Sequence, residues 1–350
     1  MPERANLSFP QGTELVFGPQ ASRRQYITDR LAEVMRGWGF SEIVLPGLDS
    51  DAAGDETELY HLTDREGRRL ALRSDFTRVA AKALALELRR QPRQIGACYE
   101  GTVYRFAPSG HGTRVEHTQR GLEWVNARGA IFDAATLLIA LECLAACGVQ
   151  GAVIVIGHAG FVHAALGQGF DRRLLEAIDH KNPTRIAELC RRAGVPAPQA
   201  ALLTELPLLT GGPEVFTRAR ALGLPQGAEA ALSELEALHQ LLAQCGASGL
   251  IYDLGEVRRF DYYSGFMFKA YHPQVGEELG GGGRYDRLFD RFGLSVPAVG
   301  LGFNIARLAD ATDENAYAAN GQAIRAAGIE ALKQAVAQRA NGTQIRLEDA

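Results

Sequence analysis

Two neighbouring stretches of the sequence constrain the fold most strongly, namely VRRFDYYSGFMF at 257–268 and GGGGRYD at 280–286. The first stretch alternates like a strand, and alternate side chains of a strand share one face. One face then carries Arg259, Asp261 and Tyr263. Because glycine has no side chain, the second stretch lets backbone approach a ligand closely. We predict that the two stretches form the wall and floor of a pocket for a small polar molecule.

The residue types in these stretches suit such a pocket. Arginine binds carboxylate or phosphate with two parallel hydrogen bonds, and tyrosine adds an apolar wall with a hydroxyl at its tip. The alternative is a strand with an internal ion pair and two core tyrosines, followed by a glycine-rich hairpin. These residues alone fit both interpretations.

Length, charge and cysteine content exclude several classes of protein. A chain of 350 residues can bury the core of one large domain or two modest ones. Its formal net charge of −4 argues against avid nucleic-acid binding. The five cysteines include no CxxC pair, so neither a zinc ribbon nor a disulfide scaffold is indicated. We find no signal peptide and no long apolar run, and we expect a cytoplasmic protein without a metal or cofactor.

Hydrophobic periodicity predicts an α+β fold, with an antiparallel sheet flanked by helices. We expect helices at about 21–36, 75–89, 133–146 and 303–309. Asp75 and Asp133 stand where a helix N-cap is expected. We expect strands at 42–45, 69–73, 95–106, 115–125, 151–157, 249–254, 257–268 and 296–300.

Two regions depart from this alternation of strands and helices. Strand signals vanish over about 160–246, where helical periodicity is broken by proline and glycine, and we predict a helical insertion there. Residues 311–350 are polar and alanine-rich, and we predict a helical tail. The expected organisation is a domain over 1–310 that contains the insertion, followed by this tail.

Several separated motifs together resemble the catalytic domain of class II aminoacyl-tRNA synthetases, specifically histidyl-tRNA synthetase. The resemblance covers about 8–309 and includes VRRFDYY, GGGGRYD and the predicted hairpin at 98–123. GFSEIVLP at 39–46 resembles the first class II motif, which implies a homodimer interface. Arg105 matches the arginine of the second motif, and Arg307 matches that of the third.

The resemblance also implies a histidine pocket, position by position. LRSDFT at 72–77 resembles the family segment whose acid and threonine meet the α-amino group. Gln119 would meet the polar backbone of the amino acid, Glu123 its imidazole, and Arg258 its carboxylate. Tyrosines would close the pocket. The full implied set is Asp75, Thr77, Gln119, Glu123, Arg258, Tyr262, Tyr263 and Tyr285.

The sequence departs from the synthetase pattern at the nucleotide site. Ala107 replaces the acid that follows the hairpin arginine, and Ala306 replaces the acid of the third motif. Val115 stands in register with the second hairpin arginine, although Arg114 is adjacent. We see no anticodon-binding domain after 310. Adenylation chemistry depends on several such partners acting together, so Arg105, Arg114 and Arg307 are expected to be vestigial.

This pattern is similar to the regulatory-subunit family of ATP phosphoribosyltransferase, a synthetase paralogue in histidine biosynthesis. The similarity implies a non-catalytic subunit that works with a short catalytic subunit and takes L-histidine as effector. It also implies a homodimer within a hetero-oligomer, with no tRNA and no membrane partner. One alternative is an enzyme, either a truncated histidyl-tRNA synthetase or another class II adenylating ligase. The other is an orphan amino-acid-binding module or a structural scaffold.

Simpler roles are open for several of these residues. Asp75 can cap the helix that follows it, which is compatible with a pocket role. Gln119 and Glu123 can be surface residues of an edge strand. Arg284 and Asp286 can form an ion pair that stabilises a loop, and His111 and His117 are expected to be solvated or structural.

Overall fold

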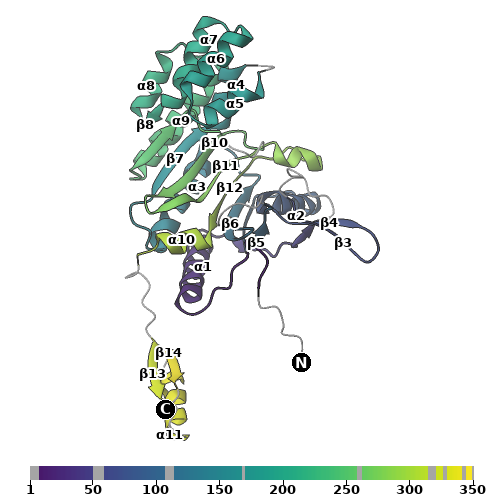
Figure 1. The fold of residues 1–350 in the computed structure, drawn as a ribbon, viewed down its shortest axis with the longest axis vertical. Helices are drawn as coiled ribbons and strands as arrows, with labels where there is room; N and C mark the ends of the chain where they lie inside the picture. The colour runs from purple at the N-terminus through teal and green to yellow at the C-terminus, as the bar shows by residue number, and fades with distance from the viewer. Residues whose placement is uncertain are drawn as a thin grey trace.

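A mixed sheet forms the centre of the computed structural model, which describes residues 8–49, 59–106, 114–167, 170–257, 262–313, 321–325, 329–340 and 344–348 (Figure 1). Within those residues the sheet has nine strands, in the order β1-β5-β6-β12-β11-β10-β7-β9-β8. The strands are β1 (Ser41–Glu42), β5 (Ile95–Tyr104), β6 (Glu116–Val125), β7 (Val153–His158), β8 (Thr210–Gly211), β9 (Leu250–Asp253), β10 (Phe266–His272), β11 (Val275–Arg284) and β12 (Ala298–Asn304).

The pairing is antiparallel except for β1 with β5 and β7 with β9. Parallel neighbours need a long crossover, and each of these pairs has one. The chain between β7 and β9 is the helical region, and the chain between β1 and β5 carries a small sheet and a helix. The predicted antiparallel α+β fold is therefore confirmed, with these two parallel pairs added.

Helices cover both faces of the sheet. On one face, α1 (Pro19–Gly37) and α3 (Ala130–Ala146) pack into a core with Leu122 and Leu301. On the other face, α2 (Phe76–Arg90) and the short η3 (Leu288–Phe292) pack with Tyr99 and Val125. Leu122 and Val125 of β6 thus belong to different cores, as the alternation of a strand requires.

A smaller sheet precedes α2 and is formed by β2 (Leu48–Asp49), β4 (Arg69–Leu72) and β3 (His61–Thr63), in that order. Asp75 then caps α2, because its side chain accepts a hydrogen bond from the Arg78 backbone N–H at 3.1 Å. The predicted N-cap role of Asp75 is confirmed.

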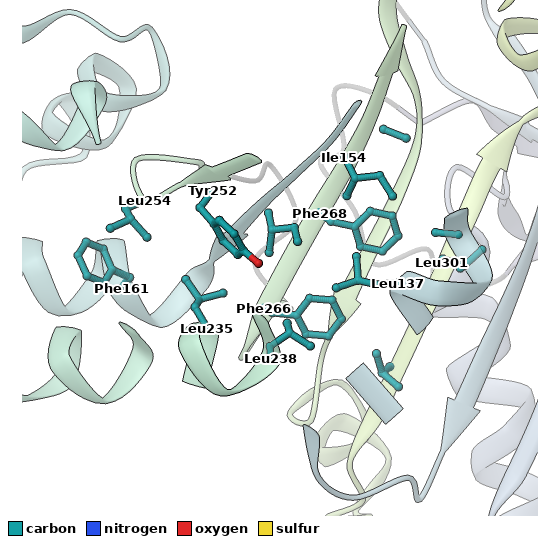
Figure 2. Close-up of a cluster of buried hydrophobic side chains, with 14 of the residues drawn as sticks. Leu137, Ile154, Phe161, Leu235, Leu238, Tyr252, Leu254, Phe266, Phe268 and Leu301 are labelled. Carbon is teal, nitrogen blue, oxygen red and sulfur yellow. The ribbon is translucent and has the colours of Figure 1, made fainter. Parts of the chain in front are cut away.

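The predicted insertion is a helical layer that shares a core with the sheet. It consists of α4 (Ala159–Leu166), α5 (Arg172–Asp179), α6 (Pro183–Ala193), α7 (Ala197–Glu205), η2 (Leu206–Leu208), α8 (Glu214–Arg220) and α9 (Gln226–Gln244). Figure 2 shows Phe161 of α4 next to Leu254, and Leu235 of α9 next to Tyr252 of β9, with Phe266 and Phe268 of β10 farther along the same core. The insertion also supplies β8, the last strand of the main sheet.

Two local predictions are wrong. The strand predicted over 257–268 begins only at Phe266, and Tyr262–Gly265 is irregular, so the proposed alternation of faces does not hold there. Residues 258–261, with Arg258, lie outside the described residues. Asp133 does not cap α3, because Gly129 occupies that position; its carboxylate instead pairs with buried Arg284.

The end of the described chain differs from the predicted helical tail. It contains β13 (Gly321–Arg325), α11 (Ile329–Ala340) and β14 (Gln344–Glu348), and the two strands pair in parallel. A helix between two parallel strands is the usual crossover, so periodicity found the helix but not its short flanking strands. Among the described helices, none combines the length and the apolar character needed to cross a membrane.

α10 (Ile305–Ala311) follows β12 directly and is capped by Asn304, whose side chain accepts from the Arg307 backbone N–H at 3.1 Å. This strand and helix together place Arg307 at the edge of the pocket described next.

Candidate functional site

A cavity of about 80 Å³ opens on the sheet face that α2 covers. Its wall brings together residues from distant parts of the chain. The lining includes Asp75, Thr77, Gln119, Tyr262, Tyr263, Tyr285, Arg105 and Arg307, all of which the sequence analysis singled out. Tyr99, His117, Glu278 and Asn304 line it as well.

Glycines of β11 and β12 form the floor of the cavity. A Cβ added at Gly282 would overlap the Gly300 carbonyl oxygen, and one at Gly300 would overlap the Glu123 carboxylate. The close packing of the two strands therefore requires glycine at these positions. A Cβ at Gly302 would meet nothing within 4 Å, which shows that this position faces open space.

β6 supplies one side of the site through alternate residues. His117 and Gln119 line the cavity, and Glu123 lies on the same face, whereas Leu122 points into the opposite core. β6 runs between β5 and β12, so it is an interior strand. The alternative that Gln119 and Glu123 are surface residues of an edge strand is therefore wrong.

Glu123 lies behind the cavity wall rather than in it. Its side chain is buried, at 2% exposure. The Tyr99 hydroxyl donates to Glu123 Oε1 at 2.9 Å, and the Tyr285 hydroxyl donates to Oε2. Burial raises the pKa of Glu123 to about 8, although hydrogen bonds from Thr77 and Tyr99 oppose the shift. A ligand in the cavity would meet the two hydroxyls before the carboxylate.

Aromatic rings enclose the end of the cavity that lies in front of Glu123. The ring centroids of Tyr262 and Tyr263 are 4.9 Å apart, and those of Tyr262 and Tyr285 are 5.7 Å apart. Tyr99 stacks on Phe76 at 4.5 Å. Such a wall suits a small ring whose edge carries polar atoms.

The opposite end of the cavity is cationic. Arg105 Nε donates to the Ser74 carbonyl at 3.0 Å, and Arg307 Nη1 donates to the Glu278 carbonyl at 2.8 Å. Burial, with the charges of Arg105 and Arg307, lowers the pKa of His117 to about 4. His117 is therefore neutral near pH 7, and the two arginines supply the positive charge.

Arg114 does not join this group, in contrast to its expected place in a vestigial nucleotide site. Its guanidinium lies 3.4 Å from Glu14 Oε2, and it does not line the cavity. The neighbouring Val115 N–H donates to the Gly12 carbonyl at 3.0 Å. The segment before α1 thus holds this end of β6 and draws Arg114 toward it.

Arg284 forms the ion pair with Asp286 that the sequence analysis gave as its simpler role. Arg284 Nη1 donates to Asp286 Oδ1 at 3.0 Å, and Arg284 Nε donates to Asp133 Oδ1 at 2.8 Å. Asp286 Oδ1 in turn accepts from the Ala298 N–H at 3.1 Å. This network fixes the chain on both sides of Tyr285.

Sequence reasoning missed Tyr99 as a pocket residue. Tyr99 pairs with Gly121 across the β5–β6 ladder, two residues from Glu123 along β6. The missing side chain at Gly121 leaves room for the Tyr99 ring, since a Cβ there would lie 2.7 Å from the Tyr99 hydroxyl. The sequence signal that could have identified Tyr99 is the register of the β5–β6 hairpin, which pairs this residue with a glycine.

The sequence of this chain is similar to those of two related groups of known proteins. The family model for histidyl-tRNA synthetase matches residues 12–308. The ATP phosphoribosyltransferase regulatory subunit of Thermus thermophilus is 36% identical over 86% of this chain and 82% of its own length. That of Moorella thermoacetica is 30% identical over 98% of this chain and 92% of its own length.

Solved structures agree with this similarity. An ATP phosphoribosyltransferase regulatory subunit/histidyl-tRNA synthetase from Bacillus halodurans C matches with a TM-score of 0.86 and 27% identity, over 99% of this chain and 94% of that chain. The histidyl-tRNA synthetase of Nostoc sp. PCC 7120 matches with a TM-score of 0.81 at 18% identity, over 99% and 87% of the two chains, which is a likeness of fold alone.

Proposed function

Because this chain belongs to the family of ATP phosphoribosyltransferase regulatory subunits, which have the fold of histidyl-tRNA synthetase, we propose that it controls a short catalytic subunit of that transferase. In this proposal the chain has no catalysis of its own. It is required for phosphoribosyl transfer, the first step of histidine biosynthesis, and it transmits inhibition by L-histidine. The free thiols of all five cysteines suit a reducing cytoplasm.

The observation that carries the proposal is the convergence of an amino-acid-sized polar set on one cavity. Asp75 and Thr77 offer oxygens to an ammonium group, and Gln119 offers an amide beside them. The tyrosine wall suits an imidazole ring. We assign the carboxylate of histidine to Arg258 on the strength of the resemblance alone.

The cationic end supports the absence of adenylation chemistry. Arg307 Nη2 lies 2.5 Å from Glu277 Oε2, so a protein carboxylate already engages it. Ala306 beside it offers no oxygen to a metal-bound nucleotide. An in-line transfer needs preorganised charges for the triphosphate, and the retained arginines alone do not supply them.

The decisive experiment is reconstitution with a purified short catalytic subunit. We expect the chain alone to show no histidine-dependent ATP–pyrophosphate exchange, and we expect the mixture to transfer phosphoribosyl groups. L-histidine should inhibit the mixture, with a coupling on the order of 1–3 kcal/mol between effector and activity. Pyrophosphate exchange by the chain alone would instead identify an amino-acid-activating enzyme. Binding of neither histidine nor the catalytic subunit would leave only an orphan amino-acid-binding module or a structural scaffold.

We further propose that the chain forms a homodimer through the edge of the sheet at β1. β1 pairs only with β5 among the described strands, and Val44 just after it is 98% exposed. An open strand edge with an exposed apolar side chain is a surface that proteins normally cover. Sedimentation should find a dimer, whereas a stable monomer at micromolar concentration would contradict this part of the proposal.

A further inference from the structure

The outer side of α2 and the neighbouring η3 carry a concentration of positive charge. Over 79–94 and 287–295 the sequence contains six basic side chains and two acidic ones, a formal net charge of +4 in a chain whose total is −4. All eight side chains are exposed. We call this region the basic α2–η3 surface, and its charged residues are Lys82, Glu87, Arg89, Arg90, Arg93, Arg287, Asp290 and Arg291.

α2 and η3 are packed against each other, so their charges belong to one surface. Leu88 of α2 lies in the same core as Leu288 and Phe289 of η3, and the two elements are in direct contact. Arg89 Nη2 also donates a hydrogen bond to the Phe292 carbonyl. This bond ties the end of α2 to the end of η3.

Helix stability explains only part of this charge. Arg89 and Arg90 lie in the last turn of α2, where cations interact favourably with the helix dipole. Arg93, Arg287 and Arg291, by contrast, have no carboxylate partner among the residues that the structure describes. Because like charges repel one another, this surface is stabilised by a partner that brings negative charge.

The composition of the surface fits a protein partner better than a nucleic acid. Arginine is enriched in protein–protein interfaces and among the residues that dominate their binding energy. Leu86, one helical turn from both Lys82 and Arg90, is 59% exposed and offers an apolar side chain for such an interface to bury. The two phenylalanines of the region, Phe289 and Phe292, are not exposed and offer no ring for stacking bases.

Both elements of the surface begin at the cavity. Asp75 caps α2, and Phe76 and Thr77 in its first turn line the cavity wall. Tyr285, another lining residue, comes three positions before the start of η3. Since rigid secondary elements carry displacements along their length, a ligand that shifts either element also shifts the basic α2–η3 surface.

We propose that the basic α2–η3 surface is the docking site for an acidic face of the short catalytic subunit. The inference rests on the proposed function, because it locates on this chain the contact through which that subunit is controlled. Complementary charge speeds the association of two proteins and fixes their orientation. Occupancy of the cavity then reaches the partner through two elements that line the cavity and form the docking surface.

The test measures binding of the purified catalytic subunit to the full chain by biolayer interferometry. The main variant combines Arg93→Glu and Arg291→Glu, two exposed positions without carboxylate partners among the described residues, so the fold should be unaffected. We expect its affinity to fall by about thirtyfold or more, mainly through slower association. Arg287→Glu alone should weaken binding by about fivefold.

Two controls separate a specific contact from a general effect of charge. Arg93→Lys combined with Arg291→Lys keeps the charge, and its affinity should stay within about threefold of wild type. Arg172→Glu combined with Arg191→Glu makes the same change in net charge on α5 and α6, which Figure 1 shows apart from α2. This second control should bind the catalytic subunit as wild type does.

Two further measurements exclude damage to the fold or to the cavity. Melting temperature and L-histidine binding by calorimetry should be unchanged in every variant, because none of the substituted arginines lines the cavity. Raising NaCl from about 50 mM to about 300 mM should weaken wild-type binding severalfold more than binding by the variant with Arg93→Glu and Arg291→Glu.

Wild-type affinity in the variant with Arg93→Glu and Arg291→Glu would overturn the inference, and so would an equal loss in that variant and in the control on α5 and α6. Loss of binding to an RNA oligonucleotide, with unchanged binding to the catalytic subunit, would assign the surface to nucleic acid and also overturn it. A wild-type chain that does not bind the catalytic subunit refutes the proposed function itself, and the inference with it.

Discussion

The buried carboxylate of Glu123 should make the stability of the protein depend on pH in a defined direction. The folded-state pKa of about 8 is above the ordinary value of 4.5, because burial favours the neutral form. The folded chain therefore retains a proton that the unfolded chain releases. The stabilisation is complete below pH 4.5 and is lost as pH rises through 8.

The size of the effect follows from the shift. A difference of about 3.5 pKa units, at about 1.4 kcal/mol per unit, corresponds to on the order of 5 kcal/mol in the free energy of unfolding. Glu123→Gln keeps the shape of the side chain but cannot ionise. The stability of this variant relative to wild type should therefore rise by several kcal/mol between pH 5 and pH 9.

Urea unfolding of both proteins across this pH range measures the difference directly, because the other groups titrate alike in the two chains. Glu87→Gln is the control, since Glu87 lies on the exposed side of α2 and pairs with Arg90 at 2.9 Å. Its curve should run parallel to that of wild type. A difference between Glu123→Gln and wild type that does not change with pH would refute the reasoning.

Three further substitutions test other parts of the structure. Asp75→Ala should lower stability by about 1 kcal/mol through loss of the α2 cap and should weaken histidine binding in calorimetry, whereas Asp75→Ser should restore the cap but not the binding. Gly302→Ala should weaken histidine binding with little change in melting temperature, because its methyl group enters open space in the cavity, whereas Gly276→Ala on the exposed part of β11 should change neither. Arg284→Met should cost about 3–5 kcal/mol in urea unfolding by leaving Asp133 unpaired, and adding Asp133→Leu should recover part of that loss.

Much of the fold could be predicted because its signals are local. The residues of 115–125 predicted the strand that the structure shows as β6, and the proline and glycine breaks marked the helical insertion. Asp75 stood directly before an apolar periodic run, which is the ordinary position of an N-cap. In each of these cases the residues that decide the structure lie within a few positions of one another.

The errors concern residues whose partners are distant in sequence. Asp133 looked like a cap, but its partner Arg284 is 151 positions away, and only the folded sheet brings the two charges together. Tyr99 depends on the register of β5 against β6. The segment 262–265 has strand-like residues, yet the backbone bonds of Ser264 and Gly265 to Arg284 and Ala159 hold it in an irregular course.

The shared core between the helical region and the main sheet limits how the protein can change shape. Tyr252 and Phe161 are completely buried where the two meet, and β8 from the helical region is hydrogen-bonded to β9. A hinged swing of these helices would open that core and break the strand pairing. If ligand binding in the cavity changes the conformation of this helical layer, the change must therefore be a small shear between packed elements that keeps the core closed.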